Sequence, residues 1–168
     1  DHLVENYGTR IIKIPDEMFV LNKRHVLGIC DLLIERDYDL NFWAYARIDT
    51  MQPEFLDKLR RAGIQWLGIG IESASKFVRD GMTKGKFGDD DIRQTIRRIR
   101  DAGLYISANY IFGLPDDTHE SMQETLDMAL DFNTEWANFY SAMAYPGSPL
   151  YAMAKEKGWP LPDDAGGP

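Results

Sequence analysis

Glu72 is the acidic residue that the sequence places most clearly at a potential functional site, the end of a buried strand. It follows an apolar run at residues 66–71 (WLGIGI), which is typical of a strand buried on both faces of a parallel sheet. Gly68 and Gly70 alternate within this run and indicate a face where a ligand or another backbone comes close. Barrels and open α/β sheets carry their chemistry at the carboxyl ends of such strands. Glu72 is therefore a candidate site residue, although it could equally cap the following helix together with Ser73.

Arg47 is a second candidate, because it ends a strand-like, aromatic-rich stretch at residues 41–48 (NFWAYARI). The guanidinium fork suits a carboxylate or ribose hydroxyls, but it could also pair with Asp49 or with Glu72. A metal-free lyase or isomerase that uses Glu72 as the base and Arg47 as the electrophile is one hypothesis for this pair. It is the weakest, because no lysine or histidine stands at a predicted strand end.

Composition argues against several kinds of site and partner. The 168 residues include one cysteine, Cys30, and three scattered histidines, so the segment alone should not hold a transition metal. Cys30 lies in the apolar stripe of a predicted helix, and we interpret it as a core thiol. The net charge of −8 argues against nonspecific binding to nucleic acid.

Hydropathy argues against a membrane partner. No apolar run approaches the roughly 18 residues of a membrane span, and the amino terminus lacks a signal-peptide pattern. We therefore expect a cytoplasmic protein. The first residue is not methionine and the last residues resemble a linker, so we also expect a piece of a longer protein.

The candidate residues need a scaffold in which strands and helices alternate. After a helix end at residues 1–8, the pattern predicts strands at 10–14, 41–48, 66–73, 104–112 and 136–144. Helices are expected at 22–36, 53–62, 75–82, 89–103, 122–132 and 150–157, with a loop at 83–88 (TKGKFG) and a capping box formed by Asp117 and Glu120.

This alternation requires parallel strands joined by right-handed crossovers. No glycine-rich dinucleotide motif follows any strand. The expected fold class is α/β: a partial, TIM-like (β/α) barrel of parallel strands over residues 1–160, followed by a linker or tail at 161–168. The first strand, at 10–14, would be an exposed edge, so self-association through it is expected.

Five segments together resemble one known family. They are DEMF (16–19), ARID (46–49), LRRAGIQWLGIGIES (59–73), NYIFGLPDDTHES (109–121) and YPGSPLY (145–151). In this order they are similar to the later part of a radical S-adenosylmethionine domain, of the branch that often carries a cobalamin-binding domain. The resemblance runs from about residue 11 to residue 159. It implies a partial barrel of six strands, of which this chain would hold strands two to six.

The resemblance also implies cofactor contacts. Glu72 would lie near the ribose or methionine part of S-adenosylmethionine, where a carboxylate can accept hydrogen bonds from both ribose hydroxyls. Arg47 would be a second polar contact. Tyr140 and Ser141 would belong to the segment whose backbone borders adenine.

Residues 109–116 are similar to the GxIxGxxE motif of this family. By the resemblance, Ile111 would pack on adenine and Gly113 would keep the backbone close. Asn109 stands where the motif has its first glycine, and Asp116 stands where it has glutamate. Ile111 and Gly113 are therefore the positions that transfer directly.

The cluster part of the family pattern is missing from this chain. The resemblance implies deoxyadenosyl-radical chemistry, such as methylation or cyclisation, with S-adenosylmethionine and a 4Fe-4S cluster in the full-length parent and cobalamin as a further candidate. The CxxxCxxC cysteines and the GGE-like loop have no counterpart here, so we expect the segment alone to hold no cofactor and to be inactive. A cofactor-free barrel remnant that acts as a structural or binding module is the alternative.

Overall fold

The computed structural model describes residues 1–16, 19–51, 53–81 and 88–161, without the side chains of residues 89 and 90. The predicted tail at 161–168 and the loop at 83–88 lie almost wholly outside the described residues. The elements, in chain order, are α1 (His2–Tyr7), β1 (Ile11–Lys13), α2 (Lys23–Arg36), β2 (Asn41–Ala46), the 3-10 helix η1 (Ile48–Thr50), α3 (Pro53–Arg61), β3 (Ile64–Glu72), α4 (Lys76–Gly81), α5 (Asp89–Asp101), β4 (Tyr105–Phe112), α6 (His119–Phe132), β5 (Trp136–Ser141) and α7 (Pro149–Lys157).

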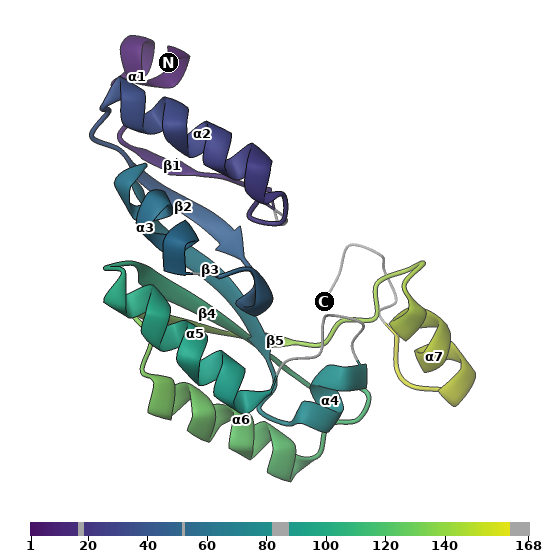
Figure 1. Cartoon of the computed structure of the whole chain (residues 1–168). Helices are drawn as coiled ribbons and strands as arrows, with labels where there is room; N and C mark the ends of the chain where they lie inside the picture. Colours follow the sequence, from purple (N-terminus) through teal and green to yellow (C-terminus); the bar gives the residue numbers. More distant parts are fainter. Residues whose placement is uncertain (17–18, 52, 82–87, 162–168) are drawn as a thin grey trace.

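The five strands form one parallel sheet in the order β1-β2-β3-β4-β5. Each strand is therefore the neighbour of the next, as expected when every connection crosses over on the same side. Figure 1 shows α2, α3, α5 and α6 along one side of the curled sheet, whereas α7 stands apart from it. The predicted partial (β/α) barrel is confirmed.

The core lies between the sheet and its helices, because alternate residues of each strand point to that side. In β3 these residues are Leu67, Ile69 and Ile71, and all three have no exposed surface. They pack in the same core cluster as Ile92 and Ile99 of α5. Burial of each such side chain stabilises the fold by roughly 1.5–3 kcal/mol. The other face of the sheet is concave and carries the remaining half of the strand residues.

Cys30 belongs to this core, as predicted. Its helix begins after Asn22, whose side chain accepts a hydrogen bond from His25 N–H at 3.1 Å. Cys30 is fully buried on the inner side of α2. Burial raises the pKa of its thiol from 9.0 to about 11.

We expect native Cys30 to react with a thiol reagent at pH 8 only after denaturation. The thiol ionises at a lower pH in the unfolded protein than in the folded one. The stability that depends on a neutral, buried thiol is therefore complete below pH 9 and is lost as the pH rises towards 11. The loss should reach roughly 2–3 kcal/mol. Urea midpoints of the wild type and of Cys30→Ala at pH 8 and pH 10 test this. An equal pH dependence in both proteins would contradict it.

The start of α6 differs from the prediction. The cap is Thr118, whose side chain accepts from Ser121 N–H at 3.1 Å while Thr118 N–H donates to Ser121 Oγ at 2.9 Å. The predicted pairing of Asp117 with Glu120 is wrong. Asp117 instead accepts hydrogen bonds from Leu114 N–H and Ser121 Oγ, so it braces the turn that follows β4. A serine hydroxyl can thus close a capping box that the sequence rule assigns to glutamate.

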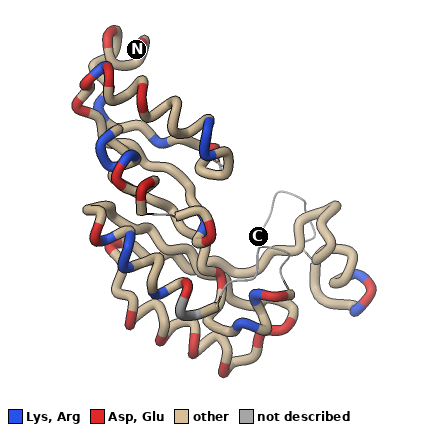
Figure 2. The backbone as a smooth tube through the Cα atoms, in the orientation of Figure 1, with Lys and Arg blue, Asp and Glu red and all other residues tan. Residues whose placement is uncertain are grey.

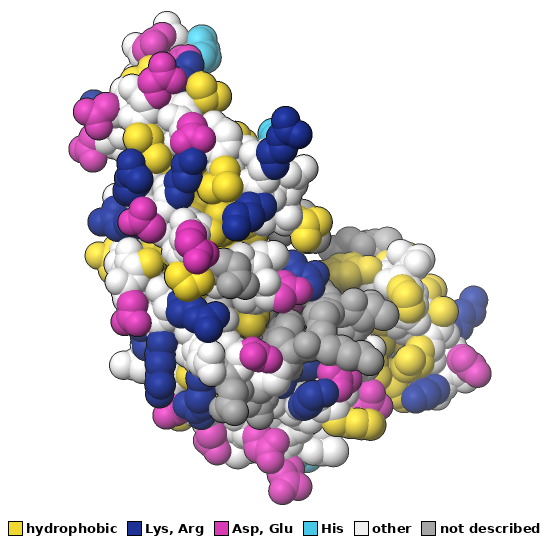
Figure 3. Space-filling model, viewed as in Figure 1, with side chains coloured by type: hydrophobic (Ala, Val, Ile, Leu, Met, Phe, Trp, Pro, Cys, Tyr) yellow, Lys and Arg dark blue, Asp and Glu magenta, His cyan; other side chains and the backbone are white. Residues whose placement is uncertain are grey.

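Charged residues lie mainly on the helices and connecting loops, as Figure 2 shows. On the face seen in Figure 3, basic and acidic side chains are interspersed along the helical layer. Lys13 and Glu72 are the charged residues within the five described strands. In the described part of the chain, no helix is long and apolar enough to cross a membrane.

β1 and β5 are the two edge strands of the sheet among the described residues, and the predicted edge is β1. In the described structure β1 pairs only with β2, and Ile11 is 76% exposed. This geometry leaves a row of backbone groups open to another strand. Self-association through this edge stays a prediction.

Candidate functional site

The carboxyl ends of the parallel strands bring most of the predicted site residues to one rim of the concave face. Gly70 pairs with Asn109, Asn109 pairs with Asn138, and Ile111 pairs with Tyr140. The rim is thus built by β3, β4 and β5 side by side. Arg47 follows β2 at the same rim.

Glu72 is the last residue of β3 and turns back over its own strand. The pairing of β3 with β4 shifts between Gly70 and Glu72, so a β-bulge ends the strand. Glu72 has φ +70°, a positive value that costs a non-glycine residue roughly 1–3 kcal/mol. A Cβ at Gly70 would lie 2.6 Å from Glu72 Oε1, so the carboxylate occupies the space above Gly70 on the concave face.

The two glycines of β3 make room for side chains of the same sheet. A Cβ at Gly68 would lie 2.5 Å from the ring of Trp43 and 3.1 Å from Tyr45 Cδ1. The glycines therefore do mark a close approach. We expected a ligand or another backbone at these positions. The structure instead places the Trp43 ring against Gly68 and the Glu72 carboxylate against Gly70.

The hypothesis that Glu72 and Ser73 cap the next helix is not supported by the contacts. Helix α4 begins at Lys76, and Val78 N–H donates to Ser75 Oγ at 3.4 Å. Ser73 Oγ accepts from Ser75 N–H within the turn before the helix. Capping thus involves the serines after the strand and leaves the Glu72 carboxylate on the concave face.

Asn109 joins a row of polar side chains on the concave face. Its Oδ1 accepts from Asn138 Nδ2 at 2.9 Å, and Asn138 Oδ1 accepts from Trp136 Nε1 at 2.7 Å. Asn138 Nδ2 also lies 3.3 Å from Ser107 Oγ. Sequence reasoning missed Asn138, although the alternation of polar and apolar residues in WANFYS places it on the same strand face as Tyr140.

Ile111 and Tyr140 form an apolar surface next to this row. Ile111 is half-buried and Tyr140 is 53% exposed on the neighbouring strand. Gly113, just past β4, has φ +77° with open space around its Cβ position, so the backbone conformation is what favours glycine there. Ser141 ends β5 and is exposed, and by alternation its side chain lies on the face opposite to Tyr140.

Arg47 pairs with Asp49, one of the partners weighed from the sequence. Arg47 Nε donates to Asp49 Oδ1 at 2.9 Å, and Arg47 Nη2 donates to Oδ2 at 2.7 Å. This fork holds the pKa of the Asp49 carboxyl below its usual value. Thr50 Oγ1 donates to Arg47 O and fixes the backbone of η1. Arg47 therefore lies at the rim as part of an ion pair.

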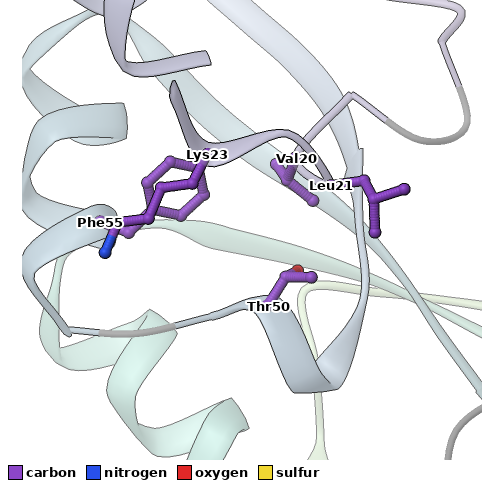
Figure 4. Close-up of a pocket in the computed structure, with 5 residues that line it drawn as sticks. All are labelled: Val20, Leu21, Lys23, Thr50 and Phe55. Carbon is purple, nitrogen blue, oxygen red and sulfur yellow. The ribbon is translucent and has the colours of Figure 1, made fainter. Parts of the chain in front are cut away.

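Near these residues lie two cavities whose lining belongs to the described part of the chain. A small one of about 160 Å³ is enclosed by the loop before α2, η1 and α3, as Figure 4 shows, and its lining residues are Val20, Leu21, Lys23, Thr50 and Phe55. It is smaller than the roughly 300 Å³ of a typical small-molecule site. The other, of about 480 Å³, occupies the amino half of the concave face and is lined by Ile11, Lys13, Asn41, Trp43, Trp66, Ser107, Trp136 and Asn138.

The chemistry of the rim suits a nucleoside. A carboxylate such as Glu72 can accept hydrogen bonds from two vicinal hydroxyls, and a branched side chain such as Ile111 can cover one face of a base. Among the described residues no group of three or more His, Cys, Asp or Glu side chains could hold a metal ion.

Comparison with known proteins is consistent with this geometry. The family described as the Radical SAM superfamily matches residues 21–129, more than half of the chain. An uncharacterised methyltransferase of Pyrococcus horikoshii is 28% identical over 148 residues, which cover 88% of this chain and 32% of that protein. The anaerobic magnesium-protoporphyrin IX monomethyl ester cyclase of Rubrivivax gelatinosus is 27% identical over 157 residues, which cover 92% of this chain and 28% of that protein. The chain thus spans about a third of the length of these relatives.

Solved structures share the fold at lower identity. The radical S-adenosylmethionine methyltransferase TsrM from Kitasatospora setae, with cobalamin and a 4Fe-4S cluster bound, superposes with a TM-score of 0.80 at 20% identity, over 89% of this chain and 29% of that chain. The cobalamin-dependent enzyme OxsB, with S-adenosylmethionine bound, superposes with a TM-score of 0.75 at 16% identity, over 95% of this chain and 30% of that chain. Both carry the same half-barrel of parallel strands.

Proposed function

Because this chain belongs to the radical SAM superfamily, we propose that its half-barrel binds S-adenosylmethionine along the rim formed by β3, β4 and β5. The family uses S-adenosylmethionine together with a 4Fe-4S cluster. When bound beside a reduced cluster, S-adenosylmethionine is the source of a reactive carbon radical. The role of this chain is to bind and orient S-adenosylmethionine.

The observation that carries the proposal is the position of the Glu72 carboxylate over Gly70. Only a residue without a side chain leaves that space, since a Cβ would lie 2.6 Å from Glu72 Oε1. The carboxylate is thereby placed on the concave face at the carboxyl end of β3, beside Asn109 of β4. This is where α/β barrels bind their ligands.

In the proposed complex each rim residue has a separate task. Glu72 accepts hydrogen bonds from the ribose hydroxyls, and Ile111 covers one face of adenine. The backbone at Gly113 and Ser141 borders the base, and Tyr140 shields its edge from water. Asn109 and Arg47 add polar contacts, with Asn109 already oriented by Asn138.

The iron-sulfur cluster does not fit the residues of this chain. Its ligands are cysteine thiolates, and the sequence holds one cysteine. That cysteine, Cys30, is fully buried on the inner side of α2. We therefore propose that the cluster is held by residues of the whole protein that this chain does not contain.

The reaction of the whole protein belongs to the same proposal. The activities for which the two relatives are named, those of a methyltransferase and a cyclase, favour methylation or cyclisation. Cobalamin is bound by two of the superposed enzymes and is the proposed additional cofactor. A reducing, cytoplasmic location would suit a low-potential cluster. The alternative, a cofactor-free remnant, is not favoured, because the family match extends across most of the barrel.

Titration of the chain with S-adenosylmethionine tests this proposal against the expectation, drawn from the missing cluster cysteines, that the segment alone holds no cofactor. At a hundred times the dissociation constant, the ligand should raise the free energy of unfolding by roughly 2.7 kcal/mol. Thermal melts with S-adenosylmethionine, with S-adenosylhomocysteine and with methionine alone measure the effect. Methionine is the control, because it lacks the nucleoside that the rim would bind. An unchanged melting temperature with both nucleoside ligands would refute binding at this rim.

A further inference from the structure

The turn that aims the Glu72 carboxylate is strained. Ser73 N–H donates to Ile71 O at 3.0 Å, which makes Glu72 the middle residue of a three-residue turn. Its φ of +70° matches the rare γ-turn of positive φ. Strained conformations of this kind persist only where the surrounding structure holds them.

Arg79 holds the two carbonyl groups that follow Glu72. Its Nη1 donates to Ser73 O at 2.7 Å and to Ala74 O at 2.6 Å. Arg79 is only 5% exposed, although it lies on the short helix α4. Both hydrogen bonds come from Nη1, and they tie the end of β3 to α4.

Thr125 of α6 holds the same two residues from the other side. Its Oγ1 accepts from Ala74 N–H at 2.9 Å and donates to Ser121 O at 2.8 Å. Since the Thr125 proton is used by Ser121 O, the Ser73 hydroxyl is the donor in its 3.3 Å contact with Thr125 Oγ1. Ser73 and Thr125 are 0% and 1% exposed.

We propose that Thr125 and Arg79 are positioning residues for Glu72. They fix the backbone of Ser73 and Ala74 and thereby keep the strained turn closed, with the carboxylate over Gly70. The inference rests on the proposed function, because it assigns these residues to cofactor affinity through Glu72. Without them the turn relaxes, and only the fraction of molecules with the carboxylate in place binds tightly.

Thr125→Val tests this, because it keeps the shape of the side chain and removes the hydroxyl. Amide hydrogen exchange should become at least about tenfold faster at Ala74 N–H, while the core strands stay protected. S-adenosylmethionine should bind about tenfold more weakly. Thr125→Ser, which keeps the hydroxyl, should restore both values. Arg79→Gln should reproduce the valine variant.

Two controls separate positioning from a general loss of stability. Ile99→Val removes one buried methylene elsewhere in the core and should leave the affinity unchanged. In a Glu72→Gln background, Thr125→Val should weaken binding less than it does in the wild type, because its influence passes through the Glu72 carboxylate. Faster exchange with unchanged affinity, or an equal loss of affinity in both backgrounds, would overturn the inference alone. No binding by the wild type would refute the proposed function and the inference together.

Discussion

Replacement of Glu72 by glutamine is expected to weaken binding of S-adenosylmethionine by about 10- to 100-fold. Hydrogen bonds to a charged group contribute roughly 1.5–3 kcal/mol, which corresponds to that range. Glutamine keeps the size of the side chain and can still lie over Gly70. It loses the charge and one of the two acceptor oxygens that the ribose hydroxyls would share. The barrel should remain folded, because Glu72 is only half-buried and contributes no apolar surface to the core.

Calorimetric titration of matched variants measures the effect. Glu124→Gln is the control, because Glu124 is exposed on α6 and its replacement changes the net charge equally. Adenosine and 2′,3′-dideoxyadenosine identify the atoms involved. The glutamine variant should lose affinity for adenosine and none for the dideoxy compound. If both nucleosides lose affinity equally, the carboxylate does not act on the ribose hydroxyls.

Replacement of Gly68 by alanine should destabilise the fold by roughly 1–3 kcal/mol, the usual cost of overpacking. The new methyl group would lie 2.5 Å from the Trp43 ring. Movement of that ring would disturb its contacts, because the Lys13 ammonium lies 4.4 Å from its centroid and the Tyr45 ring packs edge-on with the two centroids 4.3 Å apart. The sheet or the ring must shift to accept the methyl group.

Urea unfolding measures this cost against a matched glycine. Gly28 lies inside α2 with nothing within 4 Å of its Cβ position, so Gly28→Ala should stabilise the chain by roughly 0.5–1 kcal/mol. Trp43→Leu should relieve the clash, so that Gly68→Ala costs less in that background than in the wild type. Equal midpoints for Gly68→Ala and the wild type would mean that the ring is not held in place.

The glycine pattern illustrates what an interpretation of local sequence can and cannot do. Two glycines at alternate positions of an apolar strand predicted the close approach of a ligand or another backbone, and side chains of the same sheet lie there instead. The identity of the crowding groups depended on the register between β2 and β3, which pairs Tyr45 with Gly68, and on the turn at Glu72. Neither the register nor a positive φ is encoded in the run WLGIGI itself.

The rim residues also show which features local sequence predicts and which depend on the tertiary structure. Arg47 has a forked donor group that suits several partners, and only the backbone of η1 selects Asp49. Asn138 was not predicted, because no neighbouring residue in its own stretch of sequence indicates a partner for its side chain. Its role in orienting Asn109 follows from the pairing of β4 with β5.

The sequence by itself determined the order of strands and helices, the parallel sheet and the family to which the chain belongs. These follow from hydrophobic periodicity and short motifs, which act within a few residues of chain. The tertiary structure alone decided where the Glu72 carboxylate lies and what holds it there. Its position over Gly70 requires a strained turn, and the groups that hold that turn come from Arg79, close in sequence, and Thr125, about fifty residues away. Contacts over that separation form only when the sheet and α6 pack together, because packing closes the long loop between them.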